Sequence, residues 1–286
     1  MSLLLDGKQC AFDIETQLKK TMADLTAQGQ RLPKLVVILV GVNPASISYV
    51  TNKAKACNRV GFLSEVIQMA EDSLETDIIN EVKELNKDNT VDGILVQLPL
   101  PKGINAKNVI ETIDPQKDVD GLHSVNVTKL VMNEPGFVPC TAKGVVTLLK
   151  AYQIPLLGAH AVVLGRSQLV GRPLAQLLTN ENCTVTICHS KTIDIPKYTK
   201  MADIVIAAIG KPKMITRDYL SEKTVVVDVG INKVDDKLVG DVDYANVVDL
   251  VKAISPVPKG VGPMTIVTLL QNTLDAYTLR NRINHD

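Results

Sequence analysis

The chain has 286 residues, 45% of them hydrophobic, and its 31 basic side chains balance 31 acidic ones. This length suits one large or two ordinary domains, and a net charge of zero provides no field that recruits nucleic acid or an anionic membrane. Aromatic residues make up only 3%, so the cores must consist of aliphatic side chains, which is typical of parallel sheets covered by helices.

The cysteines and the N-terminus indicate the class of protein. The five cysteines form no Cys-x-x-Cys pair and have no metal-like spacing to the four histidines, so we expect reduced thiols in a cytoplasmic protein and no bound metal. The N-terminus lacks a basic region followed by a long apolar run, and no apolar run has the length of a membrane span. We therefore expect neither secretion nor membrane insertion.

Helical and strand patterns alternate through the first 100 residues. They predict a helix over 10–28, a strand over 35–40, a helix led by 43–46 and ending near 59, a strand over 62–69, a helix over 74–85 and a strand over 92–98. Pro99 and Pro101 end the last of these strands.

The second half repeats this alternation after an irregular segment over 114–121. It predicts a helix over 141–152, strands over 161–164, 184–188, 203–209 and 224–229, a linker-like segment over 255–263, and a final helix over 265–281. The pattern favours two α/β domains with mainly parallel sheets. We expect a first domain over 1–140, with a C-terminal helix over 265–286 packing back on it, and a second, Rossmann-like domain over 141–264.

The segment from His160 to Leu178 has the order strand, glycine turn and helix. Gly165 permits the tight turn, and we expect the amides that open the helix to face an anion. A general Gly-x-Gly-x-x-Gly fingerprint would need glycines where Ser167 and Val170 stand. Alone, the segment is therefore equally compatible with an ordinary strand-to-helix turn.

The end of the next predicted strand bears on the choice of cofactor. An NAD-binding unit carries an acidic residue there for the ribose hydroxyls, but this chain has His189, Ser190 and Lys191. Ser190, Lys191 and the nearby Arg166 can donate hydrogen bonds to a 2′-phosphate, whereas a carboxylate would repel it. The sequence therefore favours NADP over NAD.

Polar side chains gather at the predicted carboxyl edge of the first sheet, where ligands of open α/β sheets bind. Tyr49 and Lys53 are four residues apart on one helix and project from the same face. Gln97 ends the third strand, and pairing of sequential strands would bring its amide near Lys53. Each of these residues also has an ordinary interpretation, as an exposed helical pair or a strand-end amide with local hydrogen bonds.

Asp118 and Asp120 lie in a loop where Gly121 permits a sharp turn, and they predict either a ligand site or an acidic turn. The Tyr-x-x-x-Lys spacing also occurs in short-chain dehydrogenases, but there the cofactor loop comes before the pair. Here Tyr49 and Lys53 precede that loop by more than a hundred residues, which disfavours that class. We expect the pair to face a substrate across an active-site cleft between the two domains.

Together these segments resemble the bifunctional methylenetetrahydrofolate dehydrogenase/methenyltetrahydrofolate cyclohydrolase family, known as FolD in bacteria. The matching motifs are Val40-Gly-Val-Asn-Pro-Ala-Ser46 with Tyr49 and Lys53, Val96-Gln-Leu-Pro-Leu-Pro101, Lys117-Asp-Val-Asp-Gly121, Gly165-Arg-Ser167 with Val170-Gly171, Asp228-Val-Gly-Ile231 and Val261-Gly-Pro-Met-Thr265. They span almost the whole chain in one order, which makes the resemblance highly specific.

The resemblance implies oxidation of 5,10-methylenetetrahydrofolate by NADP, followed by hydrolysis of the methenyl product to 10-formyltetrahydrofolate. It implies that Lys53 is the catalytic lysine, that Gln97 positions and tunes it, that Tyr49 helps place the folate, and that Asp120 holds the pterin ring. It assigns Gly165, Arg166, Ser167, Ser190 and Ile231 to the cofactor site. It also implies a homodimer, no metal, and a place in the one-carbon metabolism of purine, methionine and histidine synthesis.

Hydrolysis makes the greater chemical demand, because a lysine with an ordinary pKa of about 10.4 is a poor base at neutral pH. We expect desolvation and repulsion from the cationic methenyl group to depress the pKa of Lys53. A dehydrogenase-only relative and a non-catalytic NADP-binding module remain as alternatives. The chain also departs from the common family pattern at Gln116, Ala142 and Lys259, without loss of a proposed catalytic group.

Overall fold

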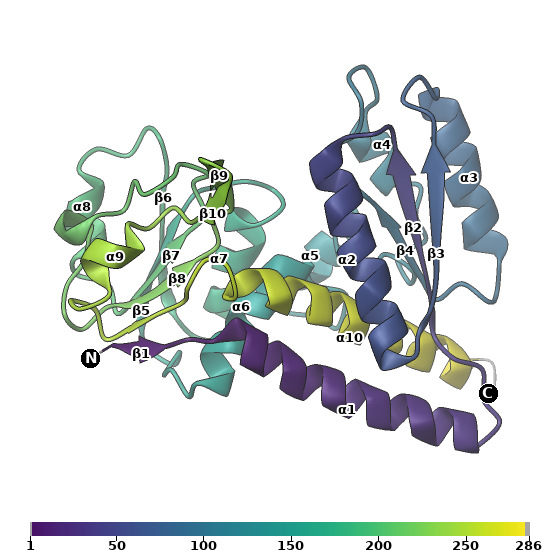
Figure 1. Ribbon diagram of the computed structural model, residues 1–286, viewed down its shortest axis with the longest axis horizontal. Helices are drawn as coiled ribbons and strands as arrows, with labels where there is room; N and C mark the ends of the chain where they lie inside the picture. Colours follow the sequence, from purple (N-terminus) through teal and green to yellow (C-terminus); the bar gives the residue numbers. More distant parts are fainter. Residues whose placement is uncertain (1, 284–286) are drawn as a thin grey trace. The chain divides into compact units, whose positions relative to one another are not determined.

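The computed structural model describes residues 2–283, which form two compact units (Figure 1). Unit 1 consists of the residues up to Phe12 together with Thr141–Thr265, and unit 2 of Asp13–Cys140 together with the residues from Ile266 onward. Among the described residues, no helix is long and apolar enough to cross a membrane.

Unit 2 is built on a three-stranded sheet in the order β3-β2-β4, with all pairs parallel. Its elements are β2 (Lys34–Val40), α2 (Pro44–Val60), β3 (Leu63–Met69), α3 (Glu75–Lys87), β4 (Gly93–Val96), α4 (Ala106–Ile110) and α5 (Ser124–Met132), with most of α1 (Gly7–Ala27) and α10 (Val261–Ile283). Strands β2 and β4 are therefore neighbours, and their carboxyl ends lie side by side.

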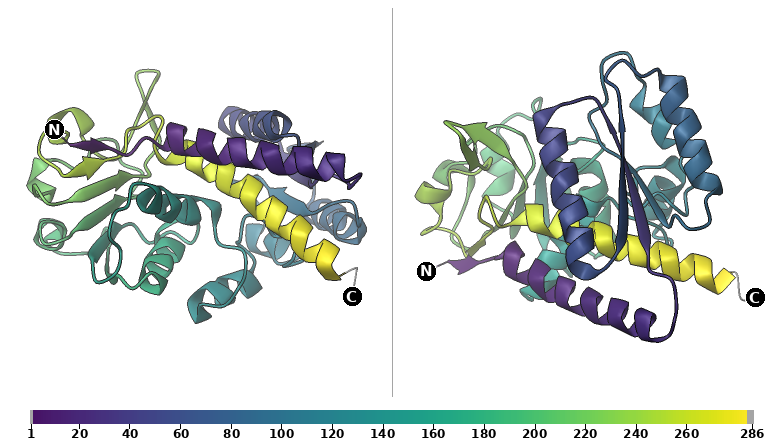
Figure 2. Two further views of the ribbon diagram at one scale, coloured as in Figure 1. Left: turned by 90° about the horizontal axis from the view of Figure 1, so that it is seen from below. Right: turned by 45° about the vertical axis from the view of Figure 1, so that its right-hand side comes forward.

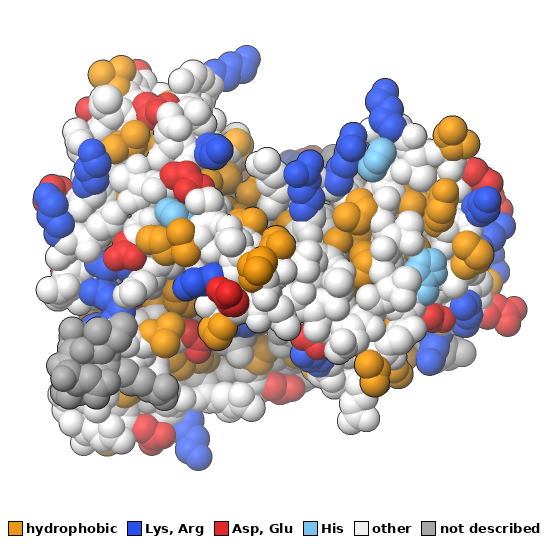
Figure 3. All heavy atoms as spheres, turned by 180° about the vertical axis from the view of Figure 1, so that it is seen from behind, with side chains coloured by type: hydrophobic (Ala, Val, Ile, Leu, Met, Phe, Trp, Pro, Cys, Tyr) orange, Lys and Arg blue, Asp and Glu red, His pale blue; other side chains and the backbone are white. Residues whose placement is uncertain are grey.

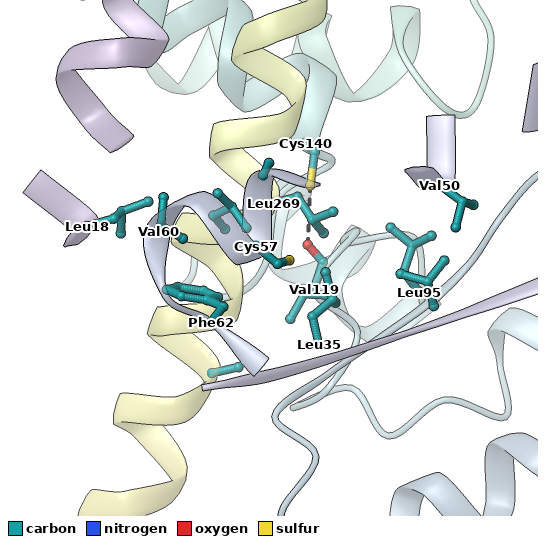
Figure 4. Packing of buried hydrophobic residues seen from close by; sticks show 14 of the residues in the cluster. Leu18, Leu35, Val50, Cys57, Val60, Phe62, Leu95, Val119, Cys140 and Leu269 are labelled. Carbon is teal, nitrogen blue, oxygen red and sulfur yellow. Dashed lines mark hydrogen bonds between the residues drawn. The ribbon is translucent and has the colours of Figure 1, made fainter. Parts of the chain in front are cut away.

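The central strand β2 is buried on both faces, as its continuous apolar sequence predicts. Leu35, Val37 and Leu39 pack with residues of α1, α2 and α10, and Figure 4 shows part of this cluster around Cys57. The alternate side chains of β2 pack against α3 and α4 on the other face. Helices thus cover both faces of β2 and leave the strand ends for function.

The amino edge of this sheet is held by charged and aromatic groups. Arg31 donates two hydrogen bonds of 2.7 Å to Asp92, which directly precedes β4, and its guanidinium lies 4.7 Å from the ring centre of Tyr277. Tyr277 belongs to α10, which lies beside α1 (Figure 2). These contacts attach the C-terminal helix to unit 2.

Unit 1 contains a six-stranded parallel sheet in the order β1-β11-β8-β7-β5-β6. Its strands are β1 (Leu3–Leu4), β5 (His160–Leu164), β6 (Thr184–Cys188), β7 (Ile204–Ala207), β8 (Val225–Asp228) and β11 (Ala253–Ile254). The helices are α6 (Cys140–Ala151), α7 (Gly171–Asn180), α8 (Ile195–Thr199), η1 (Arg217–Tyr219) and α9 (Tyr244–Val247), and β9 (Asn232–Val234) pairs with β10 (Lys237–Val239) in a hairpin.

The long alternating elements confirm the predicted α/β class with parallel sheets, but several boundaries differ. Residues 2–12 belong with unit 1 rather than with the first domain, because β1 pairs in parallel with β11. The predicted linker over 255–263 is partly wrong, since α10 already begins at Val261; Pro263 is tolerated in its first turn, where amides lack helical partners. The short α4, α5, α8 and α9 and the β9–β10 hairpin were not predicted.

The surface fits the balanced composition. On the face shown in Figure 3, basic and acidic side chains are interspersed and apolar side chains are scattered among them. No patch of one sign of charge dominates that face.

Candidate active site

Helix α2 starts and ends at residues suited to those positions. The Asn43 side chain accepts hydrogen bonds from the amides of Ala45 and Ser46, and Pro44 occupies the first turn, where no amide donor is needed. Gly61 ends the helix with φ of +92°, a left-handed conformation that glycine adopts without strain. These caps fix which residues of α2 face the sheet.

Lys53 lies along the inner stripe of α2 and meets Gln97 at the end of β4. Its Nζ donates a hydrogen bond of 3.0 Å to Gln97 Oε1, so the proximity predicted from the sequence is observed. The Gln97 backbone amide donates to Ile38 O at 2.9 Å, and its side-chain Nε2 donates to Leu98 O at 2.6 Å. Because Nε2 is engaged elsewhere, the amide oxygen is directed at the lysine.

Tyr49 lies one turn before Lys53 and is 43% exposed. The intervening helical turn places both residues toward the carboxyl end of β2, while Ser46 and Val50 turn into the core. The exposed Tyr49 ring can stack on a flat ligand, and its hydroxyl can donate a hydrogen bond to that ligand.

Asp120 belongs to a loop that is anchored by two buried residues, Lys117 and Asp118. Lys117 is 1% exposed, and its Nζ donates to the carbonyls of Leu85, Asn86 and Asp88 at 2.7–2.8 Å, at the carboxyl end of α3. An ammonium group stabilises the unpaired carbonyls of a helix end. Burial lowers the pKa of Lys117 to about 8, and nearby Arg280 adds to this effect.

Asp118 holds the other side of the same loop. Its carboxylate accepts hydrogen bonds from the amides of Leu122 and His123 and from Asn126 Nδ2, at the start of α5. Burial raises the pKa of Asp118, although these donors oppose the shift. Asp118 is therefore a structural residue, as its alternative interpretation allowed, whereas the half-buried Asp120 is left at the loop surface.

In unit 1 the strand order reverses at β5, which pairs with β6 on one side and β7 on the other. Ligands of open parallel sheets bind outside the carboxyl ends of the strands at such a point. Gly165 follows β5 with φ of +122°, and a Cβ there would lie 2.2 Å from Ala208 O. Gly171 approaches as closely, since its Cβ would lie 2.3 Å from Gly165 O. Both positions therefore require glycine.

The start of α7 corrects one expectation. The amides of Val170 and Gly171 lie 3.2 and 3.3 Å from Ser167 Oγ, and that of Arg172 donates to Ser167 O. Two of the amides that we expected to face an anion thus donate to the Ser167 hydroxyl in this structure. The two side-chain bonds are long, so a ligand that binds at this turn competes with weak contacts.

The other predicted cofactor residues lie at this edge with exposed side chains. Arg166 and Ser190 follow β5 and β6, which are adjacent strands, and Ile231 follows β8 and is 45% exposed. After β6 the chain presents His189, Ser190 and Lys191 without an acidic residue. The turn and its side chains therefore fit a dinucleotide, and they fit an additional phosphate better than bare ribose hydroxyls.

Two buried carboxylates to which the sequence assigned no role hold the neighbouring loops. Asp228 accepts hydrogen bonds from the amides of Gly230, Asp241 and Val242, and burial raises its pKa to about 6. Asp241 accepts from amides of the loop after β7. The only local sequence signal was a glycine within two residues of each, Gly230 after Asp228 and Gly240 before Asp241, which is common in turns.

Comparison with known proteins decides the family. The family model for the catalytic domain of tetrahydrofolate dehydrogenase/cyclohydrolase matches residues 5–120, and the model for the NAD(P)-binding domain matches 139–281. Bifunctional protein FolD from Exiguobacterium sibiricum is 49% identical over 276 residues, which cover 96% of this chain and 99% of that protein. The chain belongs to the tetrahydrofolate dehydrogenase/cyclohydrolase family.

Solved structures of family members agree. The crystal structure of FolD from Campylobacter jejuni has a TM-score of 0.96 at 45% identity and covers 98% of this chain and 100% of its own. FolD from Trypanosoma brucei, complexed with NADP and an inhibitor, has a TM-score of 0.95 at 35% identity and covers 98% of this chain and 99% of its own. The resemblance recognised in the sequence motifs is confirmed.

The structure accommodates the three departures from the common family pattern, at Gln116, Ala142 and Lys259. Lys259 has φ of +83°, so this chain keeps a left-handed conformation at a position where family members often have glycine. Ala142 is buried in the first turn of α6, where proline would also be tolerated, and Gln116 is exposed.

Proposed function

We propose that Lys53 and Gln97 perform the folate chemistry of this protein, which is a bifunctional enzyme of the tetrahydrofolate dehydrogenase/cyclohydrolase family. It oxidises 5,10-methylenetetrahydrofolate with NADP and then hydrolyses 5,10-methenyltetrahydrofolate to 10-formyltetrahydrofolate. The observation that carries the residue assignment is the 3.0 Å hydrogen bond from Lys53 Nζ to Gln97 Oε1 at the carboxyl edge of the sheet.

The oxidation depends mainly on placement. NADP supplies the hydride acceptor when bound, and the nitrogen lone pairs of the folate stabilise the cation that remains. Tyr49 and Asp120 hold the folate in this proposal, Tyr49 through its exposed phenol and Asp120 through a carboxylate that can accept hydrogen bonds from the pterin. Fixing the donor carbon in this way lowers the entropic part of the barrier.

The hydrolysis requires a base, because water must lose a proton as it attacks the methenyl carbon. Lys53 in its neutral form accepts that proton. Gln97 Oε1 accepts one N–H of the lysine and so orients its lone pair. Gln97 is therefore assigned to positioning and Lys53 to proton transfer.

The cofactor assignment rests on the loops of unit 1. Gly165 and Ser167 form the turn that receives the pyrophosphate, and Ile231 packs against the cofactor from the loop after β8. Arg166 and Ser190 donate hydrogen bonds to the 2′-phosphate. The missing acidic residue after β6 supports NADP rather than NAD.

We assign the enzyme to the cytoplasm, as a homodimer that serves the one-carbon supply of purine, methionine and histidine synthesis. Support for the dimer comes from β3, an edge strand whose outer side has no strand partner among residues 2–283. Leu63 is 51% and Val66 40% exposed on it. An exposed apolar edge strand is a site for association.

One incubation tests both activities. Enzyme, 5,10-methylenetetrahydrofolate and NADP are combined, and the methenyl and formyl products are separated, which avoids the background decay of the methenyl compound. We expect both products in enzyme-dependent amounts. Accumulation of the methenyl compound alone would indicate a dehydrogenase-only enzyme, and NADP binding without turnover a binding module.

The role of Lys53 is tested by Lys53→Met, with Lys55→Met on the exposed part of the same helix as the matched control. We expect Lys53→Met to lower cyclohydrolase kcat by about 1,000-fold or more, in the range of a lost general base, and Lys55→Met to leave it unchanged. Wild-type cyclohydrolase activity in purified Lys53→Met would refute the assignment. Oxidation is a weaker test, since Lys53 also contacts the folate.

A further inference from the structure

The rule for open parallel sheets places the nucleotide-binding crevice of unit 1 between the loops after β5 and β7, which we call its two walls. The sequence motifs describe only one of them. The first wall is the turn after β5, which begins at Gly165. The second is the loop after β7, Ala208–Lys211, because β7 is the neighbour of β5 at the point where the strand order reverses. Ala208 donates to Leu164 O at 2.9 Å, and a Cβ on Gly165 would collide with Ala208 O.

The second wall has no regular structure of its own and is held by one buried carboxylate. Asp241 is 0% exposed. Its Oδ2 accepts hydrogen bonds from the amides of Ile209 at 2.6 Å and Gly210 at 2.9 Å, and its Oδ1 accepts from the amide of Lys211 at 2.9 Å. Three successive backbone amides therefore converge on a single side chain.

The same carboxylate also holds the loop after β8. Asn232 Nδ2 donates to Asp241 Oδ1 at 2.9 Å, directly after the proposed cofactor residue Ile231. A Cβ on Gly230 would lie 2.3 Å from the Asp241 carboxyl, so this loop packs directly on it. Asp241 thus connects two loops that follow neighbouring strands at the carboxyl edge.

Asp241 is itself fixed in place. Its backbone amide donates to Asp228 Oδ1 at 3.0 Å, and the amide of Val242 donates to Asp228 Oδ2 at 2.9 Å. Asp241 is thus held by the end of β8 and accepts four hydrogen bonds. These contacts restrict the loop after β7 to few conformations.

We propose that Asp241 is a positioning residue for NADP: it shapes the second wall of the crevice through the amides of residues 209–211 and fixes Ile231 through Asn232. This inference rests on the proposed function, in that NADP is taken as the ligand of the crevice. It assigns Asp241 no contact with the cofactor.

The chemistry explains why a carboxylate is needed. Each Asp241 oxygen accepts hydrogen bonds from two donors. An asparagine would have an NH₂ group in place of one of these oxygens, so the two N–H donors that face it would have no acceptor. Asp241→Asn keeps the size of the side chain and removes the acceptor capacity of one of its two oxygens. The loop after β7 would then lose at least one of its three backbone hydrogen bonds to this side chain.

The matched control is Asp203→Asn. Asp203 also accepts a backbone amide, that of His160 at 3.0 Å, but it precedes β7 and so lies at the amino edge of the same sheet. We expect Asp241→Asn to weaken NADP binding by tenfold or more in isothermal titration calorimetry, and Asp203→Asn by less than twofold. In steady state, KM for NADP should rise at least tenfold in Asp241→Asn, with KM for methylenetetrahydrofolate changing less than threefold.

A second pair of variants reaches the same loop without touching a buried charge. Gly210 has φ of +71° and Gly158 has φ of +75°, and an added Cβ meets nothing within 4 Å at either. Gly210→Ala strains the backbone of the second wall. Gly158→Ala introduces the same backbone strain in a loop at the amino edge of the sheet, because the two glycines have similar φ angles. We expect only Gly210→Ala to weaken NADP binding, by about threefold to tenfold, while both lower the melting temperature alike.

The outcomes separate the two proposals. If Asp241→Asn does not fold, the glycine pair decides the question. Equal NADP affinity in Gly210→Ala and Gly158→Ala, or in Asp241→Asn and Asp203→Asn, would overturn the positioning role. A wild-type protein that binds NADP in the calorimeter but does not oxidise methylenetetrahydrofolate would instead overturn the proposed function and leave the calorimetric test intact.

Discussion

The carboxyl edges of the two sheets hold their functional residues in different ways. In unit 2, Lys53 and Gln97 are half-buried and joined by a side-chain hydrogen bond of 3.0 Å. In unit 1, the proposed cofactor residues Arg166 and Ser190 are exposed, and the surrounding loops are set by Gly165 and the buried Asp241. The proposed folate site depends on side-chain identity, and the proposed cofactor site depends on backbone shape.

This difference follows from what each site must do. Proton transfer needs one group with a directed lone pair, so the side chain and its orienting partner are essential. Dinucleotide binding distributes its energy over many contacts along loops, so each exposed side chain contributes a part. Variants in unit 2 should therefore affect kcat most, and variants in unit 1 should affect cofactor affinity or stability.

After Lys53→Met, the largest expected effect is that of Gln97→Leu. Removing Oε1 leaves Lys53 without its orienting acceptor, and we expect cyclohydrolase kcat to fall by about 100-fold, at the lower end for acid–base catalysis. NADP affinity in calorimetry should be unchanged. The control is Gln17→Leu at an exposed position of α1. Loss of NADP affinity comparable to the loss of kcat would contradict the contrast between the two units.

Arg166→Ala should have the next largest effect. A charge-assisted hydrogen bond contributes about 1.5–3 kcal/mol, so we expect NADP affinity to fall by about 10–100-fold and NAD affinity to fall much less. Lys223→Ala removes an exposed cation before β8, at the amino edge, and serves as control. Equal losses for NADP and NAD in calorimetric titrations would argue against a contact with the 2′-phosphate.

Asp228→Asn should change how stability depends on pH. Burial raises the pKa of Asp228 from 3.8 to about 6, so between these values the folded protein binds more protons than the unfolded chain. The stability from Asp228 is therefore fully present below about pH 4 and lost as the pH rises through about 6.

Urea unfolding of wild type and Asp228→Asn at pH 4 and pH 7 measures this contribution. Relative to the variant, wild type should be more stable at pH 4 than at pH 7 by about 2 kcal/mol. A difference between the two proteins that stays constant with pH would show that Asp228 does not titrate in this range.

The smallest expected effect is that of Lys259→Gly. A left-handed conformation costs a non-glycine residue about 1–2 kcal/mol, and the greater freedom of glycine in the unfolded chain offsets about 0.4–1 kcal/mol of that. We therefore expect the free energy of unfolding to rise by about 0.5–1 kcal/mol. Lys252→Gly, at an exposed residue outside the left-handed region, should lower it instead. A loss of stability in both variants would show that Lys259 is not strained.

The predictability of each element followed its length and periodicity. Strand β2 was evident because an apolar run of its length between turn residues is typical of a buried parallel strand, and α2 because its apolar stripe has helical spacing. Strand β1 has only two residues and pairs with β11 about 250 residues away, so nothing near it in the sequence indicates a strand. The hairpin was missed for a similar reason, since each of its strands has three residues.

The sequence by itself determined the family, the α/β class and the candidate residues, because ordered motifs and periodic apolar patterns are local properties of the chain. Only the tertiary structure decided how those residues are held. Lys117 and Asp241 bond to backbone groups about 30 residues away, and such contacts leave no periodic pattern in the sequence. The same holds for Ser167, whose hydroxyl occupies the helix amides that the turn alone appeared to offer to a ligand.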